Sequence, residues 1–147
     1  MLLIEKFLPT ARKRMCCIEV EAPLLQAARL LGRDYDMLVV CDPDGRMAGV
    51  LTKTDAVRQM GICTGASCTS PLTRAMTRDV ATAVPDGSLS DVWDMMKGRG
   101  LKNIPVIDAD RRPLGVLNAR DVLQNLWQEV QQEEDLLFNY VMNVGYR

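Results

Sequence analysis

Two short motifs place an aspartate three residues after a residue that can cap a helix. They are TKTD, from Thr52 to Asp55, and NARD, from Asn118 to Asp121. An ionised carboxylate only accepts hydrogen bonds, so both aspartates suit the vicinal hydroxyls of a ribose and would repel a phosphate. The same spacing is that of a capping box, in which both side chains serve the start of a helix. The two roles are compatible, and the motifs alone leave both open.

Each motif ends a longer stretch that occurs twice in the chain. Residues 38–55, LVVCDPDGRMAGVLTKTD, align without a gap with residues 104–121, IPVIDADRRPLGVLNARD, at an offset of 66. Upstream, residues 23–31 align with residues 88–96 at an offset of 65. An internal period that changes by only one residue indicates a duplicated supersecondary unit. A unit of about 60 residues buries too little surface to be stable alone, so we expect the two copies to pack face to face.

Hydrophobic periodicity predicts the same elements in both copies. The turn DPDG at 42–45 joins two strands as a hairpin, and residues 108–112 do so without glycine. The sequence therefore predicts an α/β fold: two βαββα repeats packed as one pseudo-symmetric unit, plus a C-terminal helix. The predicted elements are strands at 17–20, 37–41 and 47–51 with helices at 24–31 and 53–60, then strands at 80–84, 103–107 and 114–117 with helices at 89–96 and 119–131.

Composition excludes several classes of function. Lys and Arg number 18 against 19 Asp and Glu, without the clustered positive charge of nucleic-acid binding proteins. The absence of histidine removes Ser-His-Asp catalysis, Cys-His catalysis and histidine metal sites. No apolar run has the length of a membrane span or the order of a signal peptide. We therefore expect a cytoplasmic protein that is no enzyme and contacts neither a membrane nor nucleic acid.

The five cysteines form no CxxC pair, which argues against structural zinc and fits a reducing compartment. Cys41 ends an apolar strand, so we expect it in the core. Cys63 and Cys68 lie within the Gly- and Ser-rich linker, on either side of a short loop. They are either ordinary loop thiols or a redox switch.

The C-terminal stretch carries an apolar stripe that the acidic run 131–135 interrupts. It is one long helix or two, and it either docks on its own repeats or completes a dimer. Trp127 could lie at such a subunit contact. The stripe consists of Leu123, Leu126, Val130, Leu137, Val141 and Val144.

The repeated motifs resemble those of tandem CBS domains (cystathionine β-synthase domains). GVLTKTD (49–55) and GVLNARD (115–121) are similar to that family's G-apolar-apolar-(T/S)-x-x-D motif, from which Asn118 departs. IPVID (104–108) is similar to the family's apolar-Pro strand, and MTRDV (76–80) to its entry into a repeat. The resemblance covers nearly the whole chain. It divides the chain into repeat 1 (3–60), a linker (61–71), repeat 2 (72–128) and a helical tail (129–147).

In this family, the clefts between the repeats commonly bind adenosine-containing ligands such as AMP, ATP, NAD or S-adenosylmethionine. Such pairs are usually regulatory and often form homodimers. The resemblance therefore implies a sensor that binds an adenine nucleotide or other adenosyl ligand and signals to a separate, unknown effector protein. It implies no required cofactor besides this regulatory ligand. The alternative is a structural dimerisation or interaction module with empty or degenerate clefts.

The resemblance also implies which residues line the clefts. Lys102 stands where the family often faces a phosphate, and the matched residue of repeat 1 is Asp36, so we expect a phosphate nearer Lys102 and Arg120 than Asp36. The first turn of each following helix offers free backbone N–H groups to the same phosphate. Apolar strand residues, Ile18 and Val80, could sandwich a purine. The expected ligand-binding set is Thr52, Asp55, Asn118, Arg120, Asp121, Lys102, Ile18, Val80, Ile104 and Pro105.

Overall fold

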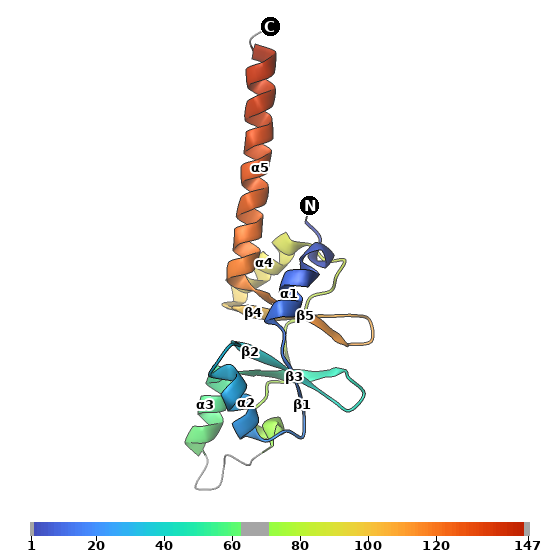
Figure 1. The fold of residues 1–147 in the computed structure, drawn as a ribbon, viewed down its shortest axis with the longest axis vertical. Helices are drawn as coiled ribbons and strands as arrows, with labels where there is room; N and C mark the ends of the chain where they lie inside the picture. The colour runs from blue at the N-terminus through green and yellow to red at the C-terminus, as the bar shows by residue number, and fades with distance from the viewer. Residues whose placement is uncertain (1, 63–70, 146–147) are drawn as a thin grey trace.

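Two small sheets face each other and one long helix projects from them in the computed structural model, which describes residues 2–62 and 71–145 (Figure 1). The predicted α/β fold of two repeats and a C-terminal helix is confirmed. Short helices begin the two repeats: η1 (Ile4–Phe7) and α1 (Leu8–Arg14) in the first, and η3 (Leu72–Arg74) in the second. The first repeat contains β1 (Cys17–Glu19), α2 (Leu24–Leu31), β2 (Met37–Cys41), β3 (Met47–Thr52) and α3 (Lys53–Ile62). The second contains α4 (Leu89–Arg99), β4 (Asn103–Ile107), β5 (Pro113–Asn118) and α5 (Ala119–Gly145).

The two hairpins pair in the same register. Met37 lies opposite Thr52 in the first, and Asn103 lies opposite Asn118 in the second, 66 residues later on both strands. Both ladders contain an irregularity at the same place, near the turn. In both turns an aspartate Oδ1, from Asp42 or Asp108, accepts two backbone N–H bonds at 2.9 Å. The aspartate is therefore the part of the turn that both repeats retain.

The predicted strand at 80–84 is wrong in extent. The segment forms a single parallel bridge to β4 at Ala83, whereas β1 pairs with β2 over three residues. In the first repeat, the Val39 N–H donates to Cys16 O at 2.9 Å. The matched donor in the second repeat would be Pro105, which has no N–H. The proline therefore ends this ladder after one bridge.

The segment that leads into each repeat, residues 2–16 in the first and 71–80 in the second, packs on the other repeat. We call it the lead-in segment. η1 is tied to the segment before α4 by the bond from the Ile4 N–H to Gly87 O, at 3.0 Å. α1 crosses β5, where Ala11 lies against the backbone of Gly115. Conversely, Thr77 exchanges backbone bonds of 2.8 and 2.9 Å with Val50 on β3. The two repeats are thus interlocked, and the helix at 4–14 was absent from the predicted elements.

Three clusters of apolar side chains form the core. One fills each repeat, and the cluster of the second repeat includes Ile4 and Ala11 from the lead-in segment. The third lies between the two sheets and joins the repeats. As expected, Cys41 is in the core, in this central cluster. The central cluster consists of Met37, Val39, Cys41, Met47, Val50, Ile107 and Val116.

The C-terminal stretch forms one helix, since α5 continues through the acidic run at 131–135 (Figure 1). Its first turns pack against α4 and β5, and Val122 is buried there. The remainder extends away from both repeats. No helix within residues 2–62 and 71–145 combines the length and apolarity needed to cross a bilayer.

Candidate functional site

The first motif forms a complete capping box at the start of α3. The Thr52 N–H donates to Asp55 Oδ2 at 3.0 Å, and the Asp55 N–H donates to Thr52 Oγ1 at 3.2 Å. The Thr77 hydroxyl lies 3.4 Å from each oxygen of the same carboxylate, and Arg58 Nη1 lies 3.6 Å from Oδ1. Asp55 is only 7% exposed. Its carboxylate is therefore surrounded by partners from the protein itself.

The second motif uses its aspartate differently. Asn118 Oδ1 accepts the Arg120 N–H at 3.0 Å and so caps α5, but the Asp121 carboxylate turns to Arg14 at the end of α1. Arg14 Nε and Nη2 donate to the two carboxylate oxygens at 2.7 and 2.9 Å. This hydrogen bond raises the pKa of Arg14 above its ordinary value, although partial burial acts against it. The Asp121 side chain remains 20% exposed, so solvent and a ligand can reach it.

Three adjoining hollows lie beside these motifs, and we call them together the inter-repeat groove. The Asp121 hollow measures about 350 Å³, the Thr52 hollow about 590 Å³, and the hollow with Arg120 about 450 Å³. Each volume falls within or near the range of small-molecule sites. Asp36 lines all three, and the first residues of β2 and β4, Met37 and Asn103, line the first two. The groove therefore crosses the centre of the pseudo-symmetric pair.

Half of the predicted ligand-binding residues line this groove, from both repeats. They surround a mixed set of charges, because Asp36 shares two hollows with Lys102 and also lies 3.6 Å from Lys53 Nζ. The matched charges of the two repeats are thus brought together and not separated. The predicted residues that line the groove are Thr52, Lys102, Asn118, Arg120 and Asp121.

The other predicted residues line none of these three hollows. Asp55 is buried in its capping box, and Pro105 is buried in β4. Ile18 and Ile104 belong to the two repeat cores, with 4% and 0% exposure, and Val80 packs on the central cluster. Inward-facing apolar residues of a small sheet are needed for its core. The structure therefore does not place Ile18 and Val80 on either side of this groove.

Sequence reasoning missed the contribution of the N-terminal helix to the groove. Thr10, Lys13 and Arg14 line the Asp121 hollow. The spacing of Ile4, Phe7, Leu8 and Ala11 is that of an amphipathic helix, followed directly by basic residues. That spacing was the available signal for a helix, but nothing in it indicates that the helix packs on the second repeat.

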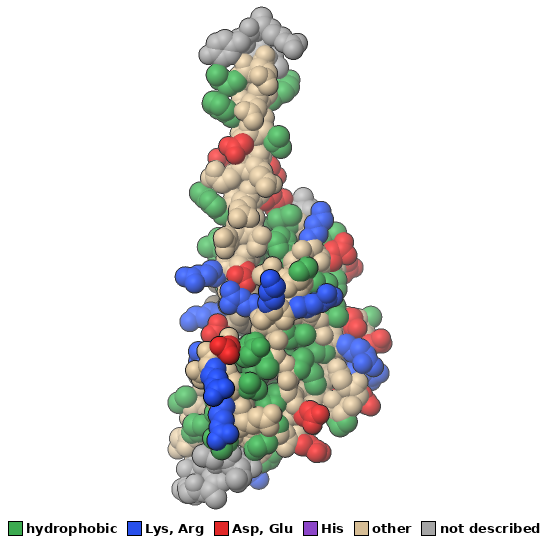
Figure 2. All heavy atoms as spheres, viewed as in Figure 1, with side chains coloured by type: hydrophobic (Ala, Val, Ile, Leu, Met, Phe, Trp, Pro, Cys, Tyr) green, Lys and Arg blue, Asp and Glu red, His purple; other side chains and the backbone are tan. Residues whose placement is uncertain are grey.

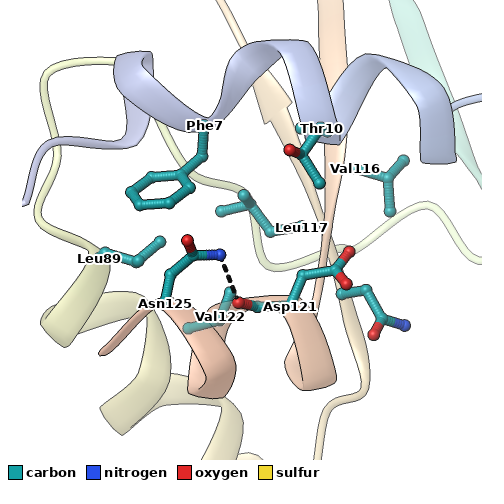
Figure 3. Close-up of a pocket in the computed structure, with 10 residues that line it drawn as sticks. Phe7, Thr10, Leu89, Val116, Leu117, Asp121, Val122 and Asn125 are labelled. Carbon is teal, nitrogen blue, oxygen red and sulfur yellow. Dashed lines mark hydrogen bonds between the residues drawn. The ribbon is translucent and has the colours of Figure 1, made fainter. Parts of the chain in front are cut away.

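Behind Asp121 the structure is closely packed. Figure 3 shows the small cavity between α1 and the start of α5, where Phe7 and Leu89 face Val122 and Asn125. The cavity has room for about 10 Å³, at the lower limit for one water molecule. The Asn125 amide donates to Asp121 O at 2.7 Å and so fixes the first turn of α5. This bond is made to the Asp121 backbone, whereas the carboxylate itself is held by Arg14 and lines the groove.

Comparison with known proteins places this architecture. The sequence profile of the CBS domain matches residues 10–61 and 72–128. The chain belongs to the CBS domain family. An uncharacterized 17.7 kDa protein of Acidianus ambivalens is 29% identical over 117 residues, which are 79% of this chain and 70% of that protein. The homoserine O-acetyltransferase of Methanohalobium evestigatum is 26% identical over 98 residues, which are 66% of this chain and only 19% of the enzyme.

Solved structures share the fold of this CBS pair. The CBS domain pair of protein MJ0100, in complex with 5′-methylthioadenosine and S-adenosyl-L-methionine, has a TM-score of 0.72 and 22% identity. The alignment covers 88% of this chain and 98% of that one. CBSX2 in complex with AMP has a TM-score of 0.75 and 19% identity, over 87% and 98% of the two chains. At these identities the likeness shows the fold alone.

Two thiols lie close together on neighbouring strands of the first sheet, Cys17 on β1 and Cys41 on β2. A hydrogen bond with the Cys41 thiol lowers the pKa of Cys17 to about 7 against the opposing effect of burial, and it raises the pKa of Cys41. Burial raises the pKa of the neighbouring Cys16. Among the described residues, no group of three or more Cys, Asp or Glu could hold a metal ion. Cys63 and Cys68, the other candidate redox pair, lie outside the described residues.

We predict that iodoacetamide modifies Cys17 at a rate that rises with pH and reaches half its maximum near pH 7. The thiolate is the reactive form, and an ordinary thiol titrates at about 8.5. Mass spectrometry of the digested protein at short reaction times measures the rate. In Cys41→Ala the midpoint moves toward about 8.5 because the hydrogen-bond donor is lost. An unchanged midpoint in that variant would contradict the assignment.

Proposed function

We propose that this CBS pair binds an adenosyl ligand in the inter-repeat groove and regulates a separate protein. The observation that carries the proposal is the Asp121 carboxylate, which Arg14 holds in place beside a hollow of about 350 Å³. A carboxylate in this setting can accept hydrogen bonds from both hydroxyls of a ribose. The complexes of MJ0100 and CBSX2 with adenosine-containing ligands support the same ligand class.

Cationic side chains give the groove a place for an anionic group. Lys13 and Arg14 line the Asp121 hollow, while Lys102 and Arg120 line the adjoining one. A phosphate there would also meet the backbone N–H groups at the start of α5. We therefore favour AMP, ATP or NAD over a neutral nucleoside. S-adenosylmethionine, which carries a sulfonium, remains within the proposed class.

The ion pair between Arg14 and Asp121 makes binding a competition. A ribose that takes the carboxylate must displace the guanidinium, which is then free to turn toward a phosphate of the same ligand. Arg14 ends α1, and α1 is the helix that joins the lead-in segment to the second repeat. Ligand binding thus acts on a contact between the repeats. Such a coupling is what a regulatory module needs to alter its shape or rigidity.

We propose that the resulting signal passes to a separate effector protein and that the chain works as a homodimer with a self-complementary interface. The ligand is regulatory, and the groove contains no histidine or metal cluster for catalysis among the described residues. The alternative is a structural dimerisation module with an empty groove. The ion pair of Arg14 with Asp121 favours that alternative, since it satisfies the carboxylate without a ligand.

A thermal-shift panel tests the proposal. Purified protein is heated with adenosine, AMP, ADP, ATP, NAD, NADH or S-adenosylmethionine, with GMP as the control nucleotide. A ligand present at about 100 times its Kd adds roughly 2.7 kcal/mol to the stability. For a chain of this length, that gain raises Tm by roughly 5–10 °C. We expect a selective shift with an adenine nucleotide.

Asp121→Asn is the matched variant, because it keeps the size of the side chain while removing the charge that holds Arg14. We expect it to abolish the shift while changing the Tm of the free protein little. A panel without any shift at millimolar ligand would reject the sensor in favour of the structural module. A shift that persists undiminished in Asp121→Asn would place the ligand elsewhere.

A further inference from the structure

Between Leu123 and Met142, α5 presents an unusually apolar surface for a helix that extends away from its own domain. Figure 2 shows hydrophobic side chains on both flanks of the projecting part, with acidic groups near its middle. The residues involved are between 39% and 71% exposed. These exposed side chains are Leu123, Trp127, Val130, Leu136, Leu137, Phe138, Tyr140, Val141 and Met142.

The exposed area is sufficient for a stable dimer. An aromatic side chain presents about 150–250 Å², so these nine side chains together expose an area on the order of 1,000 Å². The largest apolar patch on a typical monomer is about 300–600 Å². A stable protein interface buries about 800 Å² per partner. The helix therefore carries about as much apolar surface as one complete side of an interface.

The spacing along α5 is that of a coiled-coil seam. Exposed apolar residues follow each other at alternating steps of four and three, and one acidic residue, Glu134, occupies a place in the series. This step pattern places one continuous stripe against a single partner helix. It therefore favours a helix of similar length as the occupant. We call the stripe the α5 seam: Leu123, Trp127, Val130, Glu134, Leu137 and Val141.

We propose that the α5 seam pairs with the α5 seam of a second copy of this chain, in antiparallel orientation. In a parallel pair, Glu134 would face Glu134 of the second copy inside the seam, where like charges are strongly unfavourable. In an antiparallel pair centred near residue 132, Glu134 lies opposite Val130. The same register places Leu123 opposite Val141, and Trp127 opposite Leu137. The four outer apolar residues then pair with one another, and the two Glu134 carboxylates no longer face each other.

The antiparallel orientation also accounts for the end of the helix. From 136 to 142 every residue except Asn139 is apolar, so this part is apolar on all sides and not only along the seam. A helix that is apolar all round is normally buried on all sides. Antiparallel pairing brings the seam side of this end to the base of the other α5, where α4 and β5 pack. In a parallel pair, this end would contact only the same end of the second α5.

This inference rests on the proposed self-association and not on the ligand. The chain can therefore bind an adenosyl ligand without pairing through α5, and it can pair through α5 without binding a ligand. Sedimentation equilibrium of the full chain between about 1 and 100 µM measures the mass. The neighbouring Leu137 and Leu136 supply matched variants, because one lies in the seam and the other beside it, with 64% and 71% exposure. We expect a dimer whose dissociation constant rises about 100-fold in Leu137→Asp and less than about 5-fold in Leu136→Asp. The reason is that the new carboxylate at position 137 is buried in the seam, while the one at position 136 lies beside it.

Three outcomes would overturn the proposal. A monomer at 100 µM would leave the seam to a different protein. An unchanged dimer in Leu137→Asp would place the interface elsewhere on the chain. Equal weakening by the two substitutions would mean that the end of the helix, and not the seam, is the contact.

Disulfide trapping tests the orientation. Val130→Cys and Glu134→Cys chains are prepared separately, mixed and oxidised gently. After digestion, mass spectrometry identifies the disulfide-linked peptides. The peptide masses also distinguish links at positions 130 and 134 from links through the native cysteines. We expect links between position 130 and position 134 in the mixture, with neither variant linked to itself at the new position. A link of position 134 to itself would overturn the antiparallel pairing.

Discussion

Substitution of Gly115 by alanine lowers the free energy of unfolding by about 1–3 kcal/mol, because the added Cβ forces α1 away from β5. A Cβ at this position would lie 2.6 Å from Ala11 Cβ and 2.9 Å from the Ala11 backbone carbon. The added methyl group therefore separates two backbones and not two flexible side chains. The ion pair of Arg14 with Asp121 lies one turn further along α1 and is expected to loosen with it.

Gly98→Ala is the control for this substitution. Gly98 lies on the exposed side of α4, where an added Cβ would meet no atom within 4 Å, and alanine favours a helix by roughly 0.5–1 kcal/mol. Urea unfolding of both variants should therefore give changes of opposite sign. Equal and small changes would show that α1 shifts freely over β5. The matched Gly49 in the first repeat has the same function, since a Cβ there would lie 2.5 Å from Thr77 O.

Most of the fold could be predicted from the duplication in the sequence. The hairpin strands at 37–41 and 103–107 and the helix at 24–31 have the predicted bounds. Periodicity and turn chemistry are local properties, and an offset of 66 allowed each copy to support the other. The glycine of the motif was also visible in the sequence, but the contact that requires it was not, because Ala11 and Thr77 approach from the opposite repeat.

The errors have the same physical origin. The strand at 80–84 depended on whether β4 could donate a hydrogen bond at Pro105, which is a property of the neighbouring strand. The helix at 4–14 is stabilised by packing on the second repeat, far away in the sequence. In the site, residue type identified Asp55 and Asp121 as equivalent. Their environments differ because Arg14 forms a two-bond ion pair with Asp121, whereas the carboxylate of Asp55 turns back to its own helix start and to Thr77. No pattern along the chain shows that difference.

Replacement of the two matched aspartates by alanine therefore lowers the stability by unequal amounts. Asp55→Ala lowers the free energy of unfolding by about 2–3 kcal/mol, because the buried carboxylate caps α3 and accepts the Thr52 N–H. Asp121→Ala lowers it by less than about 1 kcal/mol, because its partner Arg14 is 42% exposed and returns to solvent. Urea unfolding at neutral pH, without ligand, measures both changes.

Substitution of each aspartate by asparagine distinguishes the contribution of the helix cap from that of the charge. Asp55→Asn keeps one oxygen for the Thr52 N–H, so it recovers part of the stability that Asp55→Ala loses. The same substitution at Asp121 has little stability to recover, because the lost interaction there is an exposed ion pair. If both alanine variants lost the same free energy, the two repeats would use their aspartates alike, and Asp121 would no longer be the group kept available for a ligand. If only Asp55→Ala is strongly destabilised, duplication has left one motif to stabilise the fold and the other free to bind.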